Sequence, residues 1–188
     1  MSLYTIGSST FQTKLVIHLT NRLNEIIDGK IEIRSFLIKP NGNIELNDAL
    51  ISDHHNDTLF YVKSLDASIY NTKGVFNKKY SVNESELKDF YLKIIHYDKE
   101  KENSLVIFLK DFIEKLNLKN DRRLLIKIER FVAGNGKLKV IDHQSNTNYE
   151  FNNVTVHLND INVKERKIDA LIKKIELFQK DFRLKSFK

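Results

Sequence analysis

The sequence predicts an α+β fold in which helices pack on an antiparallel β meander. Apolar residues recur at three- and four-residue spacing in four segments, which is typical of amphipathic helices. In other segments apolar and polar residues alternate, which is typical of half-buried strands. Leu, Ile, Val and Phe make up 65 of the 188 residues, enough to build a hydrophobic core. We therefore expect a single α+β domain over residues 1–188, or alternatively two subdomains, 1–118 and 119–188.

The first predicted helix covers residues 9–28. Ser9 suits the N-cap position, and Gln12 three residues later is its capping-box partner. The apolar stripe of this helix repeats at helical spacing and comprises Leu15, Val16, Leu19, Leu23, Ile26 and Ile27. Gly29 fits the position after the last turn, where a left-handed backbone ends a helix. A short strand over residues 3–6 is expected before it.

Short strands are predicted after the first helix. Residues 31–38 begin with strict alternation and end fully apolar. The Pro-Asn-Gly-Asn sequence over 40–43 is a turn signal, with a return strand at 44–46. Residues 59–62 form another apolar run, whereas residues 64–82 indicate irregular structure or short strands.

Two further helices are predicted over residues 84–97 and 104–118. Asn83 suits the N-cap of the former, whose stripe comprises Leu87, Phe90, Tyr91, Ile94 and Ile95. The stripe of the latter comprises Leu105, Phe108, Leu109, Phe112, Ile113 and Leu116. A charged break over 98–103 separates the two segments, so the helices are expected to pack antiparallel.

Beyond residue 120 the apolar period changes from about 3.6 to 2, which predicts antiparallel strands over residues 122–158. Turns are expected at 133–136 (Ala-Gly-Asn-Gly) and at 146–148 (Asn-Thr-Asn). The glycines of the former do not form a phosphate-binding loop, because Leu138 stands where that loop needs a hydroxyl residue.

The chain closes with a predicted long, basic, amphipathic helix over residues 163–182. A stripe this regular must be buried, either on the chain's own sheet or against a partner. We therefore expect it to form an interface through Ile168, Leu171, Ile175, Phe178 and Phe182.

Positive charge is concentrated in the C-terminal half of the chain. Residues 1–94 carry no net charge, so residues 95–188 hold the whole net charge of +6. A basic surface attracts polyanions, chiefly nucleic acid. The candidate nucleic-acid-binding residues are Lys164, Arg166, Lys167, Lys173, Lys174, Lys180, Arg183 and Lys185. The alternative is a solvated helix face in a lysine-rich chain.

The pentapeptide Asp53-His54-His55-Asn56-Asp57 is the most conspicuous candidate for chemistry. Imidazole and carboxylate groups are both ligands for divalent cations, which would suit a metal-dependent hydrolase. Adjacent histidines point apart on a strand, however, and no second ligand cluster accompanies them in the sequence. We therefore expect a polar loop here, with no metal, no cofactor and no catalytic residue.

Several classes of protein are excluded by composition. The chain has no cysteine, so disulfides and thiolate metal sites are impossible. No apolar run approaches the ~18 residues of a transmembrane helix, and no signal peptide is visible. We expect a cytoplasmic protein that does not contact a membrane.

No catalytic motif is recognisable, so we interpret the chain as a non-catalytic binding or accessory protein. It would act through a protein partner or by self-assembly as a homo-oligomer. Its compact, lysine- and asparagine-rich composition is typical of accessory proteins of viruses and mobile elements. Nucleic-acid binding through the basic C-terminal half is the first alternative, and a metal-dependent hydrolase is the second.

Overall fold

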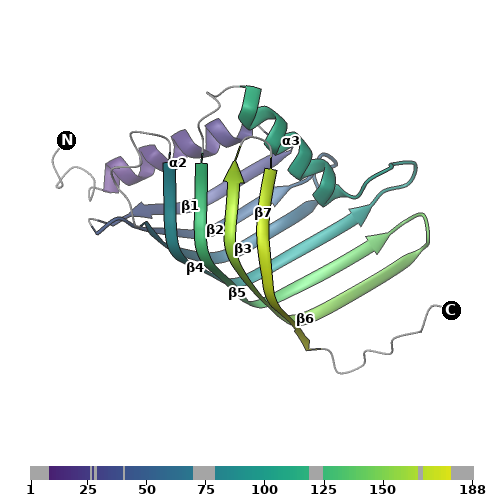
Figure 1. Ribbon diagram of the computed structural model, residues 1–188. Helices are drawn as coiled ribbons and strands as arrows, with labels where there is room; N and C mark the ends of the chain where they lie inside the picture. Colours follow the sequence, from purple (N-terminus) through teal and green to yellow (C-terminus); the bar gives the residue numbers. More distant parts are fainter. Residues whose placement is uncertain are drawn as a thin grey trace.

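The fold is a β-sheet of seven strands that lie side by side in the order of the chain (Figure 1). The computed structural model describes residues 9–25, 27, 29–39, 41–69, 79–118, 125–164 and 167–178. All neighbouring strands are antiparallel except β4 and β5, which are parallel. The elements are α2 (Ser9–Asn24), β1 (Lys30–Ile38), β2 (Asn43–Ser52), β3 (Thr58–Ile69), β4 (Lys79–His96), α3 (Ser104–Leu118), β5 (Leu125–Asp142), β6 (Thr147–Lys164) and β7 (Lys167–Phe178).

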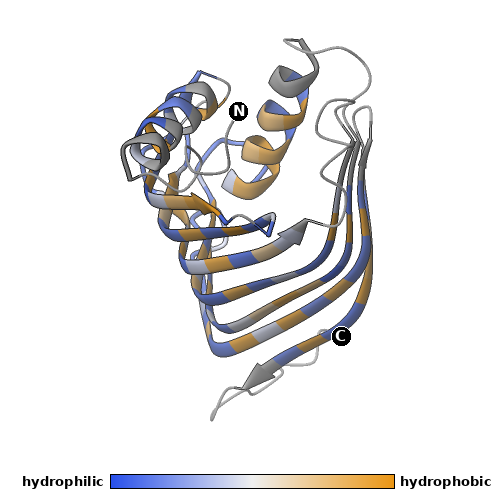
Figure 2. Cartoon of the chain, turned by 90° about the vertical axis from the view of Figure 1, so that its left-hand side faces the viewer, coloured by the Kyte–Doolittle hydropathy of each residue, from blue (hydrophilic) through white to orange (hydrophobic). Residues whose placement is uncertain are grey.

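The sheet bends sharply along a line that crosses its strands (Figure 2). Asp48 in β2, Asp89 in β4 and Asn135 in β5 have positive φ angles of 48°, 52° and 53°. Asn153 in β6 has a φ angle of 52°. Asp and Asn enter this left-handed region more readily than other non-glycine residues, because their short side chains bond to the local backbone. In β2, β4, β5 and β6 an Asp or Asn in mid-strand therefore provides the backbone conformation of the bend.

The hydrophobic core lies along this bend. Its residues stand three apart along each strand there instead of two, namely Leu46 and Ala49 in β2, Val62 and Leu65 in β3, and Leu87 and Phe90 in β4. Each strand thus has one extra residue at the bend, which shifts the alternation of its side chains by one position. The apolar side chains before and after the bend therefore lie on the same, buried face. Neighbouring strands make the same step, and the register between β3 and β4 runs through it unchanged.

Helix α3 connects the parallel strands β4 and β5 and lies on the inner side of the bend (Figure 2). It begins at an N-cap, where the Asn103 side chain accepts a hydrogen bond from the N–H of Val106 at 3.0 Å. The buried Ser104 hydroxyl accepts a hydrogen bond from the N–H of Ile95 at 3.0 Å, which ties the helix to the end of β4. No helix in the described part of the chain is long and apolar enough to span a membrane.

The predicted α+β fold with long packed helices is wrong, because the described chain is mostly strand. Of the predicted helix over 84–97, residues 84–96 belong to β4, so it cannot pack antiparallel on α3. Its apolar stripe combines the three-residue step from Leu87 to Phe90 with pairs such as Ile94 and Ile95, whose side chains point to opposite faces. A bulged strand with two apolar faces thus reproduces helical spacing.

The predicted long basic amphipathic helix over 163–182 is also wrong. Residues 163 and 164 end β6, and residues 167–178 form β7. Lys173 is bulged, because Ile172 pairs with Leu158 and Lys174 pairs with the adjacent His157. The bulge places Ile172 and Ile175 on one face of β7 and Leu171 on the other, so the three- and four-residue spacing in the sequence combines residues of two faces. Residues 179–182 lie outside the described residues.

The remaining helix predictions fare better. The predicted helix over 104–118 is confirmed as α3. The first predicted helix is confirmed as α2 but ends four residues early, at Asn24. There the Asn24 side chain accepts a hydrogen bond from the N–H of Ile31 at 2.6 Å and donates one to its carbonyl at 3.0 Å. This pairing takes the chain directly into β1.

The predicted strands also need revision. Strands β1, β2 and β3 include the predicted segments, and the antiparallel pair over 122–158 is confirmed as β5 and β6. The turn expected at 133–136 is wrong, because β5 continues through the bend there. Within the range 64–82, β3 continues to Ile69 and β4 begins at Lys79, and residues 70–78 lie outside the described residues. The short strand expected over 3–6 lies outside the described residues.

Candidate functional site

Strand β7 forms one edge of the sheet, and no described element pairs with its outer side. At the opposite edge, α2 packs against β1. Three large apolar side chains of β7 are exposed, with exposed fractions of 48% for Leu171, 61% for Ile172 and 53% for Ile175. An exposed apolar edge strand tends to pair with a strand of another chain, and most proteins protect such edges.

The structure describes the side chains of only some of the interface residues predicted from the sequence. Leu171 and Ile175 are exposed on β7, as a surface that binds a partner requires. The side chains of Ile168 and Phe178 lie outside the described side chains, and Phe182 lies outside the described residues. Ile172 was missed, because a helix would have turned it away from the stripe.

The predicted nucleic-acid-binding residues that the structure describes lie on strands and not on a helix face. Lys173 and Lys174 are exposed on β7, and the Lys174 ammonium lies 2.5 Å from the Glu176 carboxylate. The side chains of Lys164 and Lys167 lie outside the described side chains. The other predicted residues lie outside the described chain, namely Arg166, Lys180, Arg183 and Lys185.

The Asp-His-His pentapeptide forms the tight turn between β2 and β3, held by a buried carboxylate. Asp53 is 1% exposed. Its Oδ1 atom accepts hydrogen bonds from the N–H groups of His55 and Asp57, both at 2.9 Å. Its Oδ2 atom accepts one from the Tyr97 hydroxyl at 2.8 Å. A buried carboxylate needs such partners, so Asp53 fixes the shape of the turn.

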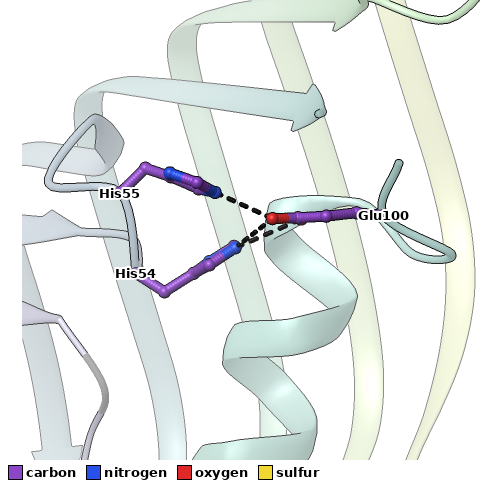
Figure 3. A group of neighbouring side chains, drawn as sticks. All are labelled: His54, His55 and Glu100. Atoms are coloured by element: carbon purple, nitrogen blue, oxygen red, sulfur yellow. Dashed lines mark hydrogen bonds and ion pairs between the residues drawn. The ribbon is translucent and has the colours of Figure 1, made fainter. Parts of the chain in front are cut away.

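The turn directs both histidines at one carboxylate (Figure 3). The Oε1 atom of Glu100 lies 3.1 Å from Nε2 of His54 and 2.7 Å from Nε2 of His55. Hydrogen bonds from His55 and His54 lower the pKa of the Glu100 carboxyl from its ordinary value of 4.5, against partial desolvation. These three side chains form the His54–His55–Glu100 cluster.

Tyr97 packs beside this cluster. Its ring lies 4.0 Å from that of His55 and 5.7 Å from that of His54, measured between centroids. The His143 ring, from the turn between β5 and β6, stacks on the Tyr97 ring, with 6.0 Å between the two centroids. Burial and the bond to Asp53 raise the pKa of the Tyr97 hydroxyl far above its ordinary value, so it remains a donor.

Asp57, the second carboxylate of the pentapeptide, is paired elsewhere. The Lys93 ammonium lies 2.8 Å from it and lowers the pKa of its carboxyl. Asp53 and Asp57 are thus both engaged with other groups, and the carboxylate that contacts both histidines is that of Glu100. Sequence reasoning missed Glu100 because it lies 45 residues beyond His55, in a charged connection with no motif of its own.

Comparison with known proteins finds no family model that matches this chain and no curated protein that matches its sequence. Function is therefore argued from the β7 edge and from the His54–His55–Glu100 cluster.

Proposed function

We propose that this chain is a non-catalytic binding protein that assembles with a second copy of itself through the edge of β7. The observation that carries the proposal is that no element of the described residues pairs with the outer side of β7, where Leu171, Ile172 and Ile175 are all about half exposed or more. A cytoplasmic location and an origin in a virus or mobile element belong to the same proposal.

The sequence of β7 is complementary to itself in one antiparallel register. With a two-fold axis at Leu171, Ala170 lies opposite Ile172 of the second copy, and Asp169 lies opposite Lys174. Lys173 is bulged in this register, as it is against β6. The axis repeats each pair, so the dimer gains two oppositely charged pairs, each worth roughly 0.2–1 kcal/mol.

The same register places apolar side chains together. Leu171 lies opposite Leu171 of the second copy, and Ile172 lies opposite Ala170. Burial of these exposed side chains removes apolar area from water, which favours association. Pairing also supplies partners to backbone N–H and C=O groups on the outer side of β7.

Charge reversal tests this register by analytical ultracentrifugation over a concentration series. The parent chain is expected to dimerise. Asp169→Lys places lysine opposite Lys174, and Lys174→Asp places aspartate opposite Asp169, so each variant should weaken dimerisation by about 5- to 30-fold. An equimolar mixture of the two variants restores opposite charges and should form a heterodimer.

Glu150→Lys is the matched control, because it reverses an exposed charge on β6 and should leave dimerisation unchanged. A parent that stays monomeric throughout the series would contradict the proposal. So would single variants that dimerise as tightly as the parent, or a mixture that forms no heterodimer.

Nucleic-acid binding stays a prediction. Lys173 and Lys174 share β7 with Asp169 and Glu176, so this strand alternates in charge instead of presenting a basic face. Metal-dependent hydrolysis also stays a prediction, and of the two carboxylates named for it Asp53 is engaged within the turn and Asp57 with Lys93 of β4.

A further inference from the structure

We propose that His54, His55 and Glu100 together bind one late first-row divalent cation, of which Zn²⁺ is the representative. The ligand atoms would be Nε2 of each histidine and a carboxylate oxygen of Glu100. The proposal is independent of assembly through β7, because the cluster lies at the β2–β3 turn.

The ligand atoms already stand near the separation that a metal ion needs. Zinc binds nitrogen and oxygen at about 2.0–2.2 Å, which puts neighbouring ligands about 3.3–3.6 Å apart in a tetrahedral site and about 2.8–3.1 Å apart in an octahedral site. The Glu100 oxygen lies 3.1 and 2.7 Å from the two Nε2 atoms, and all ligand atoms lie within 4.8 Å of one another. An ion can enter with movements of less than about one ångström.

The histidines converge because they lie in a turn and not in a strand. Asn56, the next residue, has a positive φ angle of 62°, which closes the turn. Its N–H donates to the Asp53 carbonyl at 2.9 Å, and the N–H of Asp53 donates to the Asp57 carbonyl at 2.8 Å. Adjacent histidines point apart in a strand, where side chains alternate between faces. His54 and His55 lie in a turn, so that expectation does not apply to them.

The segment that carries Glu100 is anchored as well. The carbonyl of Glu100 accepts a hydrogen bond from Nε2 of His96 at 2.9 Å and another from the Gln144 side chain at 2.8 Å. His96 ends β4, and Gln144 lies in the turn between β5 and β6. The backbone segments that carry the three ligands are thus both held in place by groups outside the cluster.

The donor set selects the class of cation. Two imidazoles and one carboxylate suit Zn²⁺, Fe²⁺, Co²⁺ and Ni²⁺, whereas Mg²⁺ and Ca²⁺ prefer oxygen ligands only. The side chains of His54, His55 and Glu100 are 19%, 48% and 25% exposed. An ion therefore reaches the cluster from solvent, and three protein ligands leave at least one position for water.

The test is calorimetric titration of the untagged full chain with Zn²⁺, and with Mg²⁺ as the comparison. We expect saturable binding of one equivalent of Zn²⁺ and no comparable binding of Mg²⁺. His55→Ala and Glu100→Gln should each weaken Zn²⁺ binding by about 10- to 100-fold or more. His157→Gln removes a histidine from β6 and should bind Zn²⁺ as the parent does.

Cobalt substitution provides a second readout, because its visible absorption responds to the ligands and their number. The parent should give a saturable Co²⁺ spectrum that Zn²⁺ displaces, and Glu100→Gln should alter it. Glu100→Gln keeps the shape of the side chain, and circular dichroism checks that the variant folds. The proposal fails if the parent does not bind Zn²⁺ saturably, or if folded Glu100→Gln and His55→Ala bind as tightly as His157→Gln.

Discussion

The ring of Phe90 in β4 lies over Gly136 in β5, so closely that a Cβ atom on the glycine would stand 2.0 Å from Cζ of the ring. Phe90 is 8% exposed and belongs to the core at the bend, so the ring cannot turn away freely. Because Gly136 has no side chain, the Phe90 ring fits against it, and the two strands pack closely there at the bend.

Gly136→Ala is therefore expected to destabilise the protein. The new methyl group must displace a buried ring, and overpacking of this kind costs about 1–3 kcal/mol in the free energy of unfolding. Urea denaturation measures the loss. Gly134→Ala is the control, because a Cβ atom there meets nothing within 4 Å. Equal stabilities of the two variants would contradict the proposed role of the Phe90 contact.

Tyr97→Phe is expected to weaken the turn between β2 and β3. It removes the hydroxyl that donates to the buried Asp53 carboxylate at 2.8 Å. A hydrogen bond to a charged group contributes about 1.5–3 kcal/mol, and the free energy of unfolding should fall by that amount. Tyr149→Phe, at a side chain that is 49% exposed, should change it little. A Tyr97→Phe variant as stable as the parent would show that Asp53 does not need this donor.

Stability is expected to fall in acid partly through the aspartates of the bend. The Tyr61 hydroxyl, followed by Arg34, lowers the pKa of Asp48 from 3.8, and the Asn135 amide, followed by Lys63, lowers that of Asp89. A depressed folded-state pKa adds stability above the unfolded value, and this is lost as pH falls through the folded value.

Asp48→Asn and Asp89→Asn test this contribution, because Asn also tolerates positive φ. Each variant should be less stable than the parent near neutral pH, and the difference should shrink below about pH 4. Urea denaturation at several pH values measures it. A difference that stays constant down to about pH 2 would assign the effect to packing instead of charge.

Ile172→Lys distinguishes an interface residue from a core residue. Ile172 is 61% exposed, so the free energy of unfolding of the monomer should change by no more than about 0.5 kcal/mol. Dimerisation should weaken, because the lysine would lie opposite Ala170 of the second copy. Sedimentation and urea denaturation of the same variant separate the two effects, and a large loss of monomer stability would place Ile172 in the core.

Local signals in the sequence predict part of this fold. Helix α3 is predicted correctly because its apolar residues keep the helical period over its whole length. β4 and β7 are wrongly predicted to be helices. Bulges at the bend and at Lys173 place apolar residues three apart in these strands, which resembles helical spacing. Periodicity cannot separate the two cases, because it records only which residues are apolar.

Only part of the His54–His55–Glu100 cluster can be predicted from the sequence. The two histidines are visible in the sequence, but their convergence depends on the Asp53 turn and the positive φ of Asn56. Glu100 enters through tertiary structure, because β3 and β4 pair and bring both loops to one end of the sheet.

The parallel seam between β4 and β5 also has a consequence for the order of folding. Lys79 pairs with Leu125 and His96 with Asp142, so every contact along the seam closes a loop of the same 46 residues (125 − 79 and 142 − 96). The pairs between β2 and β3 begin at Ser52 and Thr58 and can zip outward from their turn, each contact shortening the next closure. No contact between β4 and β5 closes a short loop, so their pairing requires the whole connection through α3 to close at once. The hairpins on either side should therefore gain protection from hydrogen exchange first, and the amides of the seam last.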